Sequence, residues 1–369
     1  MYIEIEKDIL DDALNKNGLA VNASRDLLIA MALCAQHGKH YVAVPALRGN
    51  SDLKQKLGKL LGKSYVELLD YTNRKYRETV LLKKKVCVRV VLSVQNDTSQ
   101  QGDVISVNPL NSKDFEPWTE TFVLTENLID SKFYSHTAKY FMRKERVDAC
   151  KIAYYPLMGG GVTMDKVMEQ EVNFAKHFCL AVADSDKKYP DDAVKDTAGK
   201  LLGQLKNKPF NCAAYIMDKV MEIENLIPNQ LVVKYGDGGG YKEIFMGDPS
   251  YFDMKKGLTL ECLYKQEVYD YWKSMITDEG NRFNERDDKI KDCTCENDYY
   301  KKAKGTKCIK NGFGNNLLDN VLYQKFRNTQ KERRELWNTN DKDLNGSQQT
   351  EWYNIGQIMF SWTCACKAT

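Results

Sequence analysis

The sequence contains no run of about 18 apolar residues, so no segment is long enough to cross a membrane as a helix. Its first residues, Met1–Asp8, are acidic and lack the basic and then apolar pattern of a secretory signal. These two absences predict a cytoplasmic protein with no membrane partner.

An excess of charge of one sign is also absent. The chain has 54 Lys and Arg residues against 51 Asp and Glu residues, a formal net charge of +3. Charge balance therefore does not by itself indicate a nucleic-acid-binding protein. A phosphate-binding surface would have to be local, and its candidates are Lys83–Lys85 and Lys325–Arg334, each of which is also typical of an ordinary solvated face.

A nucleotide-binding loop is missing as well. The nearest approach to one is Gly58–Ser64, where three residues rather than four separate the glycines. The spacing does not match a Walker A loop, so we expect no ATP site in this chain. No internal repeat and no long low-complexity linker is visible.

Cysteine, in contrast, is abundant, because the chain contains 11 cysteines. Six of them lie singly in apolar or helical contexts typical of reduced, buried thiols. These six are Cys34, Cys87, Cys150, Cys179, Cys212 and Cys262. The other five are close to the end of the sequence: Cys293, Cys295, Cys308, Cys364 and Cys366. A folded C-terminal segment could gather four of these five around Zn²⁺, although their C-x-C spacing also suits packing thiols.

With 369 residues and 43% hydrophobic content, the chain can bury a large core and fold as two or three domains. Residues 1–115 are predicted to form a mixed, mainly helical domain. Ala20–Gln36 and Asp52–Tyr76 have apolar residues at helical spacing, and Val86–Val94 is a β-branched run typical of a strand. A polar, turn-rich stretch, 95–113, then marks a boundary.

After this boundary, short apolar runs alternate with amphipathic stretches. The runs are Phe122–Thr125, Lys151–Leu157, Phe178–Ala183 and Asn211–Ile216. The helical stretches between them are Lys132–Arg146, Met164–His177 and Ala193–Leu205. The run ends are roughly 25 to 33 residues apart, the length of a βαβ repeat. Residues 116–275, with a last helix near Leu258–Met275, are therefore predicted to form an α/β domain whose parallel sheet has helices on both faces. Residues 276–369 would form a small unit containing Cys and Trp.

The ends of these predicted strands carry the candidate chemistry. In an open parallel sheet, functional groups lie just past the carboxyl ends of the strands. The four ends lead to Glu126, to Gly159–Gly161, to Asp184 and Asp186, and to Glu222–Asn225. Carboxylates that meet in one crevice repel each other unless a cation neutralises them, and oxygen ligands of this kind favour Mg²⁺ or Mn²⁺.

The spacing of Asp184 and Asp186 supports this interpretation. Alternate residues of an extended segment point the same way, so both carboxylates could face one metal ion. Each feature also has a plainer explanation. The Asp pair could be a solvated turn, Glu126 could serve the dipole of the following helix, and Gly159–Gly161 could be only a flexible turn.

Glu126 after a first strand, a glycine-bearing loop after a second and Asp184-x-Asp186 after a third together resemble the TOPRIM domain. This domain occurs in topoisomerases, bacterial primases, recombination-repair proteins and nucleases of the overcoming-lysogenization-defect group. The resemblance covers about residues 120–230 and is nearest to the nuclease branch, where an acidic-Asn element like Glu222–Asn225 commonly follows.

The resemblance implies a Rossmann-like TOPRIM fold and a Mg²⁺- or Mn²⁺-dependent nuclease that hydrolyses phosphodiester bonds in DNA or RNA. Glu126, Asp184 and Asp186 would hold one or two metal ions that activate a water. Glu222 and Glu224 would complete a second metal site or supply a general base. Either Lys255 or Lys256 would neutralise charge on the scissile phosphate. Antiviral defence, with a separate ATPase as partner, is the setting that the resemblance implies.

The sequence departs from the family in two respects. It has Thr125-Glu126-Asn127 where the family usually has Glu-Gly, and it lacks the fused ATPase of many family nucleases. Two other functions therefore stay open. The chain could be a catalytically inactive TOPRIM scaffold or regulator that binds an ATPase or nucleic acid, or a phosphatase acting on a small phosphate ester. The phosphatase ranks below the others, because Asp184–Lys188 lacks the Thr or Val that such enzymes place after their Asp-x-Asp pair.

Overall fold

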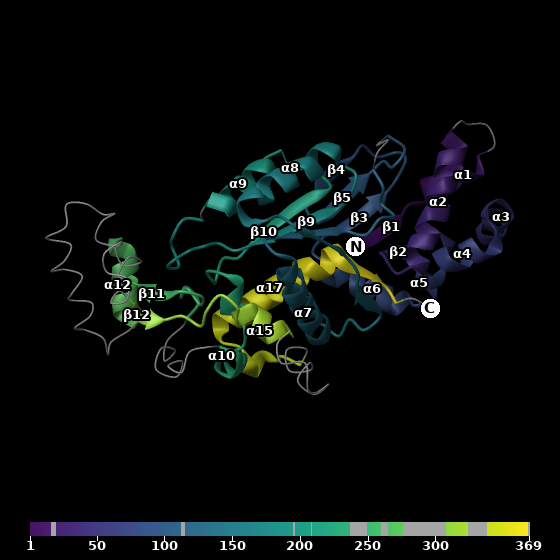
Figure 1. Ribbon diagram of the computed structural model, residues 1–369. Helices are drawn as coiled ribbons and strands as arrows, with labels where there is room; N and C mark the ends of the chain where they lie inside the picture. Colours follow the sequence, from purple (N-terminus) through teal and green to yellow (C-terminus); the bar gives the residue numbers. More distant parts are fainter. Residues whose placement is uncertain are drawn as a thin grey trace. The chain divides into compact units, whose positions relative to one another are not determined.

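The computed structural model shows a mixed α/β protein (Figure 1). It describes residues 1–15, 20–111, 115–194, 196–207, 209–236, 249–259, 265–275, 308–323 and 338–367. These residues belong to two compact units. The first consists of 1–183, 199–215 and 353–369, and the second of 184–198 and 216–352. Both units are discontinuous in sequence, so they cut across the three predicted segments. No helix in the described ranges is both long and apolar enough to cross a membrane.

The first unit contains a five-stranded sheet near the start of the chain, with strand order β2-β1-β3-β5-β4. Its strands are β1 (Tyr2–Ile5), β2 (Tyr41–Ala43), β3 (Arg89–Leu92), β4 (Ser99–Gln101) and β5 (Val104–Val107). The pairs β1–β2, β1–β3 and β3–β5 are parallel, and only β4 runs antiparallel to its neighbour β5. The predicted strand Val86–Val94 contains β3, whereas the other four strands were not predicted.

Helices connect these strands. They are α1 (Lys7–Leu14), α2 (Ala20–Gln36), α3 (Ser51–Leu61), α4 (Lys63–Leu69), α5 (Tyr71–Arg74) and α6 (Tyr76–Lys85). The bounds of α2 agree with the predicted helix. The predicted helix Asp52–Tyr76 is instead divided into α3, α4 and α5. Its first break is at Gly62, whose φ of 100° lies outside the helical region.

A second sheet in the chain has the strand order β10-β9-β6-β8. Its strands are β6 (Phe122–Thr125), β8 (Tyr155–Met158), β9 (Cys179–Ala183) and β10 (Cys212–Ile216). β6 pairs in parallel with both β8 and β9, which confirms the predicted parallel sheet. The connecting helices are α7 (Leu128–Lys144), α8 (Met164–Phe174) and α9 (Asp196–Gln204). Figure 1 shows α8 and α7 on opposite sides of β9.

The predicted strand Lys151–Leu157 is two strands. Its first part is β7 (Cys150–Ile152), which pairs antiparallel with β13 (Cys364–Cys366). Its second part is β8, in the parallel sheet. The C-terminal strand β13 thus belongs to the first compact unit, although it comes from the segment predicted to form a separate C-terminal unit.

The last helix, α17 (Gly346–Thr363), begins in the second unit, and its part from residue 353 onward belongs to the first unit, where it packs closely on α7. A Cβ atom added at Gly356 would lie 2.4 Å from the carbonyl oxygen of Thr137 and 2.9 Å from the Cβ of Phe141. Both distances are shorter than a normal carbon contact. Gly356 therefore allows the two helices to approach each other at this point.

Gly356→Ala is expected to lower the free energy of unfolding by about 1 to 3 kcal/mol, because the helices must separate to admit the methyl group. Urea denaturation monitored by circular dichroism measures the change. Gly346→Ala is the matched control in the same helix, since a Cβ at Gly346 meets no atom within 4 Å. Equal stability of Gly356→Ala and the unmodified protein would contradict the close packing.

The second unit consists of shorter elements. They are the 3-10 turn η3 (Ile223–Leu226), α10 (Asn229–Tyr235), β11 (Gly257–Thr259), α12 (Gln266–Met275), β12 (Cys308–Asn311), α15 (Leu317–Tyr323) and η7 (Asp341–Asp343). β11 and β12 form an antiparallel pair. The predicted helix Leu258–Met275 is β11 at its start and α12 at its end. The predicted basic stretch Lys325–Arg334 lies outside the described residues.

Candidate metal centre

Three acidic side chains of the second unit meet in one place. Asp184, Glu222 and Glu224 each offer a carboxylate oxygen, and these oxygens all lie within 4.8 Å of one another. We call these three residues the acidic triad. Glu222 and Glu224 are 5% and 3% exposed, and Asp184 is partly exposed. Within the described ranges, no other group of three or more His, Cys, Asp or Glu side chains is as compact.

Asp184 directly follows β9 and is fixed by the neighbouring loop. Its Oδ1 accepts a hydrogen bond from the backbone N–H of Ile223 at 3.0 Å. The next residue, Ser185, is fully buried, and its hydroxyl donates to the carbonyl of Val220 at 2.9 Å. The segment after β9 is therefore attached to the chain that leads into Glu222.

Glu222 and Glu224 lie at the start of η3, and Asn225 holds this turn in place. The backbone N–H of Glu222 donates to Asn225 Oδ1 at 2.9 Å, in a capping box. Asn225 Nδ2 donates to the carbonyls of Pro249 and Phe252 at 2.9 and 2.8 Å. Asn225 is 1% exposed, so its side chain replaces water as the partner of these backbone groups.

Two residues more than 120 positions away support the same turn. Gln348 Nε2 donates to the carbonyls of Asn225 and Ile227 at 2.8 and 2.9 Å. Trp352 Nε1 donates to the carbonyl of Leu226 at 2.7 Å. Because Gln348 and Trp352 lie on a helix, they fix a turn that has few hydrogen bonds of its own.

Lys255 brings a positive charge to the acidic triad. Its Nζ lies 3.2 Å from Glu222 Oε2 and 3.0 Å from Glu224 Oε2. Its backbone is held by a turn in which Asp253 Oδ1 accepts the N–H of Lys255 at 3.1 Å. A Cβ at Gly312 would lie 2.5 Å from the carbonyl oxygen of Lys255, so only glycine fits beside this turn. The base of the lysine side chain is thus fixed close to the two glutamates.

Burial makes the negative charge of the triad costly. Burial, together with the charge of Glu224, raises the pKa of Glu222 to about 8, although Lys255 opposes the shift. Burial likewise raises the pKa of Glu224. Burial acts to lower the pKa of Lys255, but the charges of Glu222 and Glu224 outweigh it and raise this pKa. When all four groups are ionised, the three carboxylates carry more negative charge than Lys255 alone can neutralise.

The donor set suits a hard divalent cation. Carboxylate oxygens are the ligands that Mg²⁺ and Mn²⁺ prefer, and the triad contains no sulfur or imidazole. Glu224 Oε2 is buried, and the ammonium of Lys255 lies 3.0 Å from it. A buried carboxylate oxygen is costly unless a cation pairs with it, and either this ammonium or a metal ion can supply that charge.

The sequence predicted all three members of the triad, but it grouped them differently. Asp186, the second residue of the D-x-D pair, is not among the three. Its φ of 53° is left-handed, so the segment is not extended at this residue and the alternation argument does not apply there. Glu126 follows β6 in the first unit and is half-buried, and its carbonyl accepts the N–H of Gly160 at 3.1 Å. Its role as a metal ligand stays a prediction.

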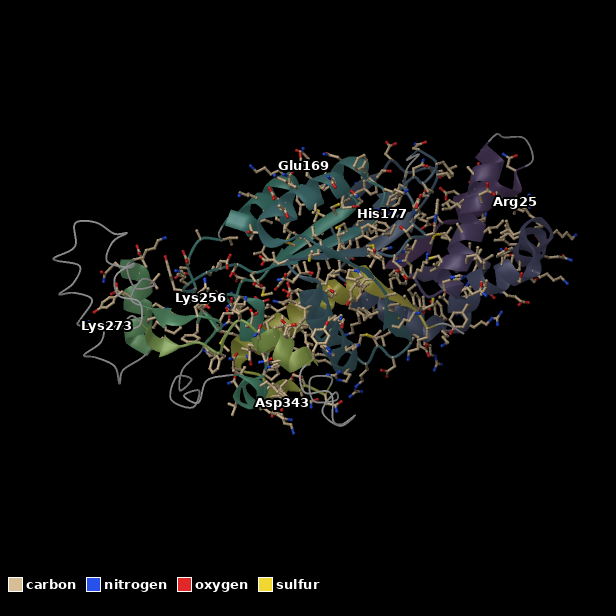
Figure 2. All side chains as sticks on the ribbon, in the orientation of Figure 1. Arg25, Glu169, His177, Lys256, Lys273 and Asp343 are labelled. Atoms are coloured by element: carbon tan, nitrogen blue, oxygen red, sulfur yellow. The ribbon has the colours of Figure 1, made fainter. Side chains whose placement is uncertain are left out.

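The structure distinguishes between the two candidate lysines. Lys255 contacts the triad, whereas Lys256, labelled in Figure 2, is exposed. The backbone N–H of Lys256 donates to Asp253 Oδ1 at 2.7 Å. Sequence reasoning could not separate the two adjacent lysines.

The predicted zinc site stays a prediction. Cys293, Cys295 and the side chain of Cys308 lie outside the described residues. Cys364 and Cys366 are buried in β13, where Cys366 lies opposite Cys150 of β7. Across the part of the chain that the structure describes, no three cysteines are close enough to hold a metal ion.

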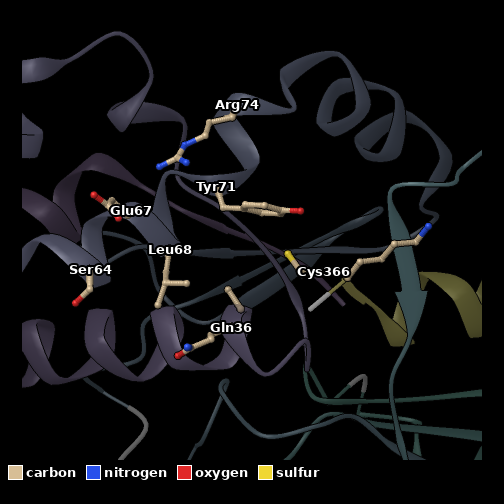
Figure 3. A pocket seen from close by; sticks show the side chains of 9 residues that line it. Gln36, Ser64, Glu67, Leu68, Tyr71, Arg74 and Cys366 are labelled. Atoms are coloured by element: carbon tan, nitrogen blue, oxygen red, sulfur yellow. The ribbon is translucent and has the colours of Figure 1, made fainter. Parts of the chain in front are cut away.

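The first unit also contains a pocket of about 290 Å³ (Figure 3). Tyr71 and Cys366 line it, and Glu67, Arg74 and Lys367 contribute charges of both signs. This mixed lining does not select one class of ligand.

Comparisons of the chain with protein-family models, curated proteins and solved structures gave no match. The acidic triad is therefore interpreted from its own geometry.

Glu224→Gln is expected to affect stability in opposite directions with and without a metal ion. In chelator the variant should melt about 2 to 4 °C higher than the unmodified protein, corresponding to about 1 kcal/mol, because the amide removes a buried negative charge. With Mn²⁺ the unmodified protein should gain stability, and the variant should lose most of this gain. Differential scanning fluorimetry measures both effects.

The control for this prediction is Glu267→Gln, an exposed glutamate on α12 in the same unit. It should change the melting temperature by no more than about 1 °C, both in chelator and with Mn²⁺. A Glu224→Gln variant that keeps the full Mn²⁺-dependent gain would show that the metal ion binds elsewhere.

Proposed function

We propose that this chain is a Mg²⁺- or Mn²⁺-dependent nuclease that hydrolyses phosphodiester bonds in DNA or RNA. The observation that carries the proposal is the acidic triad with a lysine beside it. Carboxylates and an ammonium that converge in this way are the groups needed to bind a metal ion and a phosphate ester together.

Each residue of the site would have its own role in the reaction. Asp184, Glu222 and Glu224 would hold the cation, which supplies positive charge against the phosphate oxygens when it is bound. Lys255 would stabilise the additional negative charge that develops on the phosphate. The backbone donors to Asp184 and Glu222, from Ile223 and Met254, keep one oxygen of each carboxylate fixed.

The resemblance to TOPRIM nucleases is part of the proposal. It is supported by Asp184 at the end of a parallel strand and by an acidic-Asn turn close to it. The roles expected of Glu126 and Asp186 as metal ligands stay predictions. Antiviral defence with a separate ATPase partner is the proposed biological setting.

A second candidate is a scaffold or regulator that binds an ATPase or nucleic acid without cutting it. The pairing of Lys255 with both glutamates favours this alternative, because it gives the site a stable form that needs no metal ion. A small-molecule phosphatase ranks third, because no residue of the triad is singled out as a nucleophile.

The test is a cleavage assay with the purified full chain on plasmid DNA and on single-stranded RNA, in Mn²⁺ or in EDTA. Metal-dependent cleavage of either substrate is the expected result. Absence of cleavage combined with stabilisation by Mn²⁺ would favour the scaffold. Absence of both effects would overturn the metal site itself.

A further inference from the structure

The ammonium of Lys255 lies close to two of the carboxylates that are proposed to bind the metal ion. Its Nζ is 3.0 to 3.2 Å from the Oε2 atoms of Glu222 and Glu224. The other oxygen of Glu222, Oε1, already accepts the backbone N–H of Met254 at 2.9 Å. A cation that bridges Glu222 Oε2 and Glu224 Oε2 would therefore use the same two oxygens that the lysine contacts.

The two positive charges would repel each other strongly in this position. Mg²⁺ binds carboxylate oxygens at about 2.1 Å, so an ammonium that stayed in place would be at most about 5 Å from the metal ion. The glutamates are almost fully buried, so water screens this repulsion poorly. The two shared oxygens can bind either the ammonium or the metal ion closely, but not both at once.

We propose that Lys255 is the exchangeable counter-ion of the acidic triad. It pairs with Glu222 and Glu224 when no divalent cation is bound, and it is displaced when one binds. Its ammonium then becomes available to a phosphate oxygen of the substrate. This inference rests on the proposed metal-dependent function and adds a regulatory step, because the binding of metal ion and phosphate ester becomes cooperative.

The architecture around Lys255 suits such an exchange. The backbone is fixed, because the carbonyls of Met254 and Lys255 accept the N–H groups of Phe313 and Gly314 at 2.7 and 3.2 Å. The side chain is 32% exposed and ends in a flexible four-carbon stem. The ammonium can therefore leave the glutamates without any movement of the turn that carries it.

The first experiment is Mn²⁺ binding to the full chain by isothermal titration calorimetry. Lys255→Met removes the competing charge and keeps an unbranched stem, so Mn²⁺ should bind about tenfold or more tightly. Lys255→Arg keeps the charge, so its affinity should stay as low as that of the unmodified protein or fall further. Lys256→Met, at the adjacent exposed lysine, is the control and should leave the affinity unchanged.

The second experiment follows the lysine itself, by reductive methylation and mass spectrometry. Without a divalent cation, Lys255 should react slowly, because its ammonium is held by two carboxylates. Addition of Mg²⁺ should speed its methylation several-fold, while Lys256 should react at the same rate in both conditions. This measurement needs no variant, so it decides the question even where Lys255→Met fails to fold.

The outcomes separate this inference from the proposed function. Unchanged Mn²⁺ affinity in Lys255→Met and unchanged methylation of Lys255, with Mn²⁺ binding lost in Asp184→Asn, would overturn the exchange and leave the metal site standing. Mn²⁺ binding that persists unchanged in Asp184→Asn would overturn the metal site, and the exchange with it.

Discussion

Asp184→Ala is expected to lower Mg²⁺-dependent cleavage about a hundredfold or more, because it removes the least buried ligand of the acidic triad. Asp184 follows β9 directly, so its position is set by a buried strand and a bond from Ile223. Loss of its carboxylate leaves Glu222 and Glu224 paired with Lys255, and the site should stay in its metal-free form. Initial rates of plasmid cleavage over a range of Mg²⁺ concentrations measure the loss.

Three further variants make this result interpretable. Asp184→Asn keeps an oxygen that can accept the Ile223 N–H, so it should fold normally and still lose cleavage. Asp191→Ala changes an exposed aspartate in the same segment and should cleave at the normal rate. Asp186→Ala asks whether the second Asp of the D-x-D pair also binds the metal ion. An Asp184→Asn protein that cuts as fast as the unmodified one would falsify the proposed mechanism.

The strands that the sequence predicted correctly are those with continuous apolar runs. β6 and β9 are such runs, and their parallel pairing follows from the helices between them. β1 was missed because its sequence, Tyr-Ile-Glu-Ile, contains a charge. That charge, on Glu4, is buried and pairs with Lys83 at 2.6 Å. A partner 79 residues away cannot be recognised from the local pattern.

The candidate site was predictable where it depends on strand ends, and not where it depends on turns. The position of Asp184 could be predicted because this residue comes directly after β9. The left-handed backbone conformation of Asp186 could not be predicted, because Asp also adopts extended conformations readily. The supports from Gln348 and Trp352 carry no signal in the sequence near Glu222, since they come from a helix more than 120 residues later. Tertiary hydrogen bonds of this kind determine which carboxylates finally meet.

Asn225→Ala is expected to destabilise the second unit by about 3 kcal/mol or more and to abolish metal binding. The substitution removes three side-chain hydrogen bonds and leaves the Glu222 N–H and the carbonyls of Pro249 and Phe252 without their partner. These groups are buried, so water cannot replace the amide cheaply. Hydrogen exchange of the backbone amides measures the local loss, and calorimetry with Mn²⁺ measures the loss of binding.

The matched control is Asn229→Ala, a partly exposed asparagine four residues later at the start of α10. It should change stability by less than about 0.5 kcal/mol and leave Mn²⁺ affinity unaltered. The comparison is informative because Asn225 itself binds no metal ion in this interpretation. A variant at Asn225 that is destabilised but binds Mn²⁺ normally would show that η3 is not needed to hold Glu222 and Glu224. Loss of both properties together would show that the turn and the metal centre form one structural element.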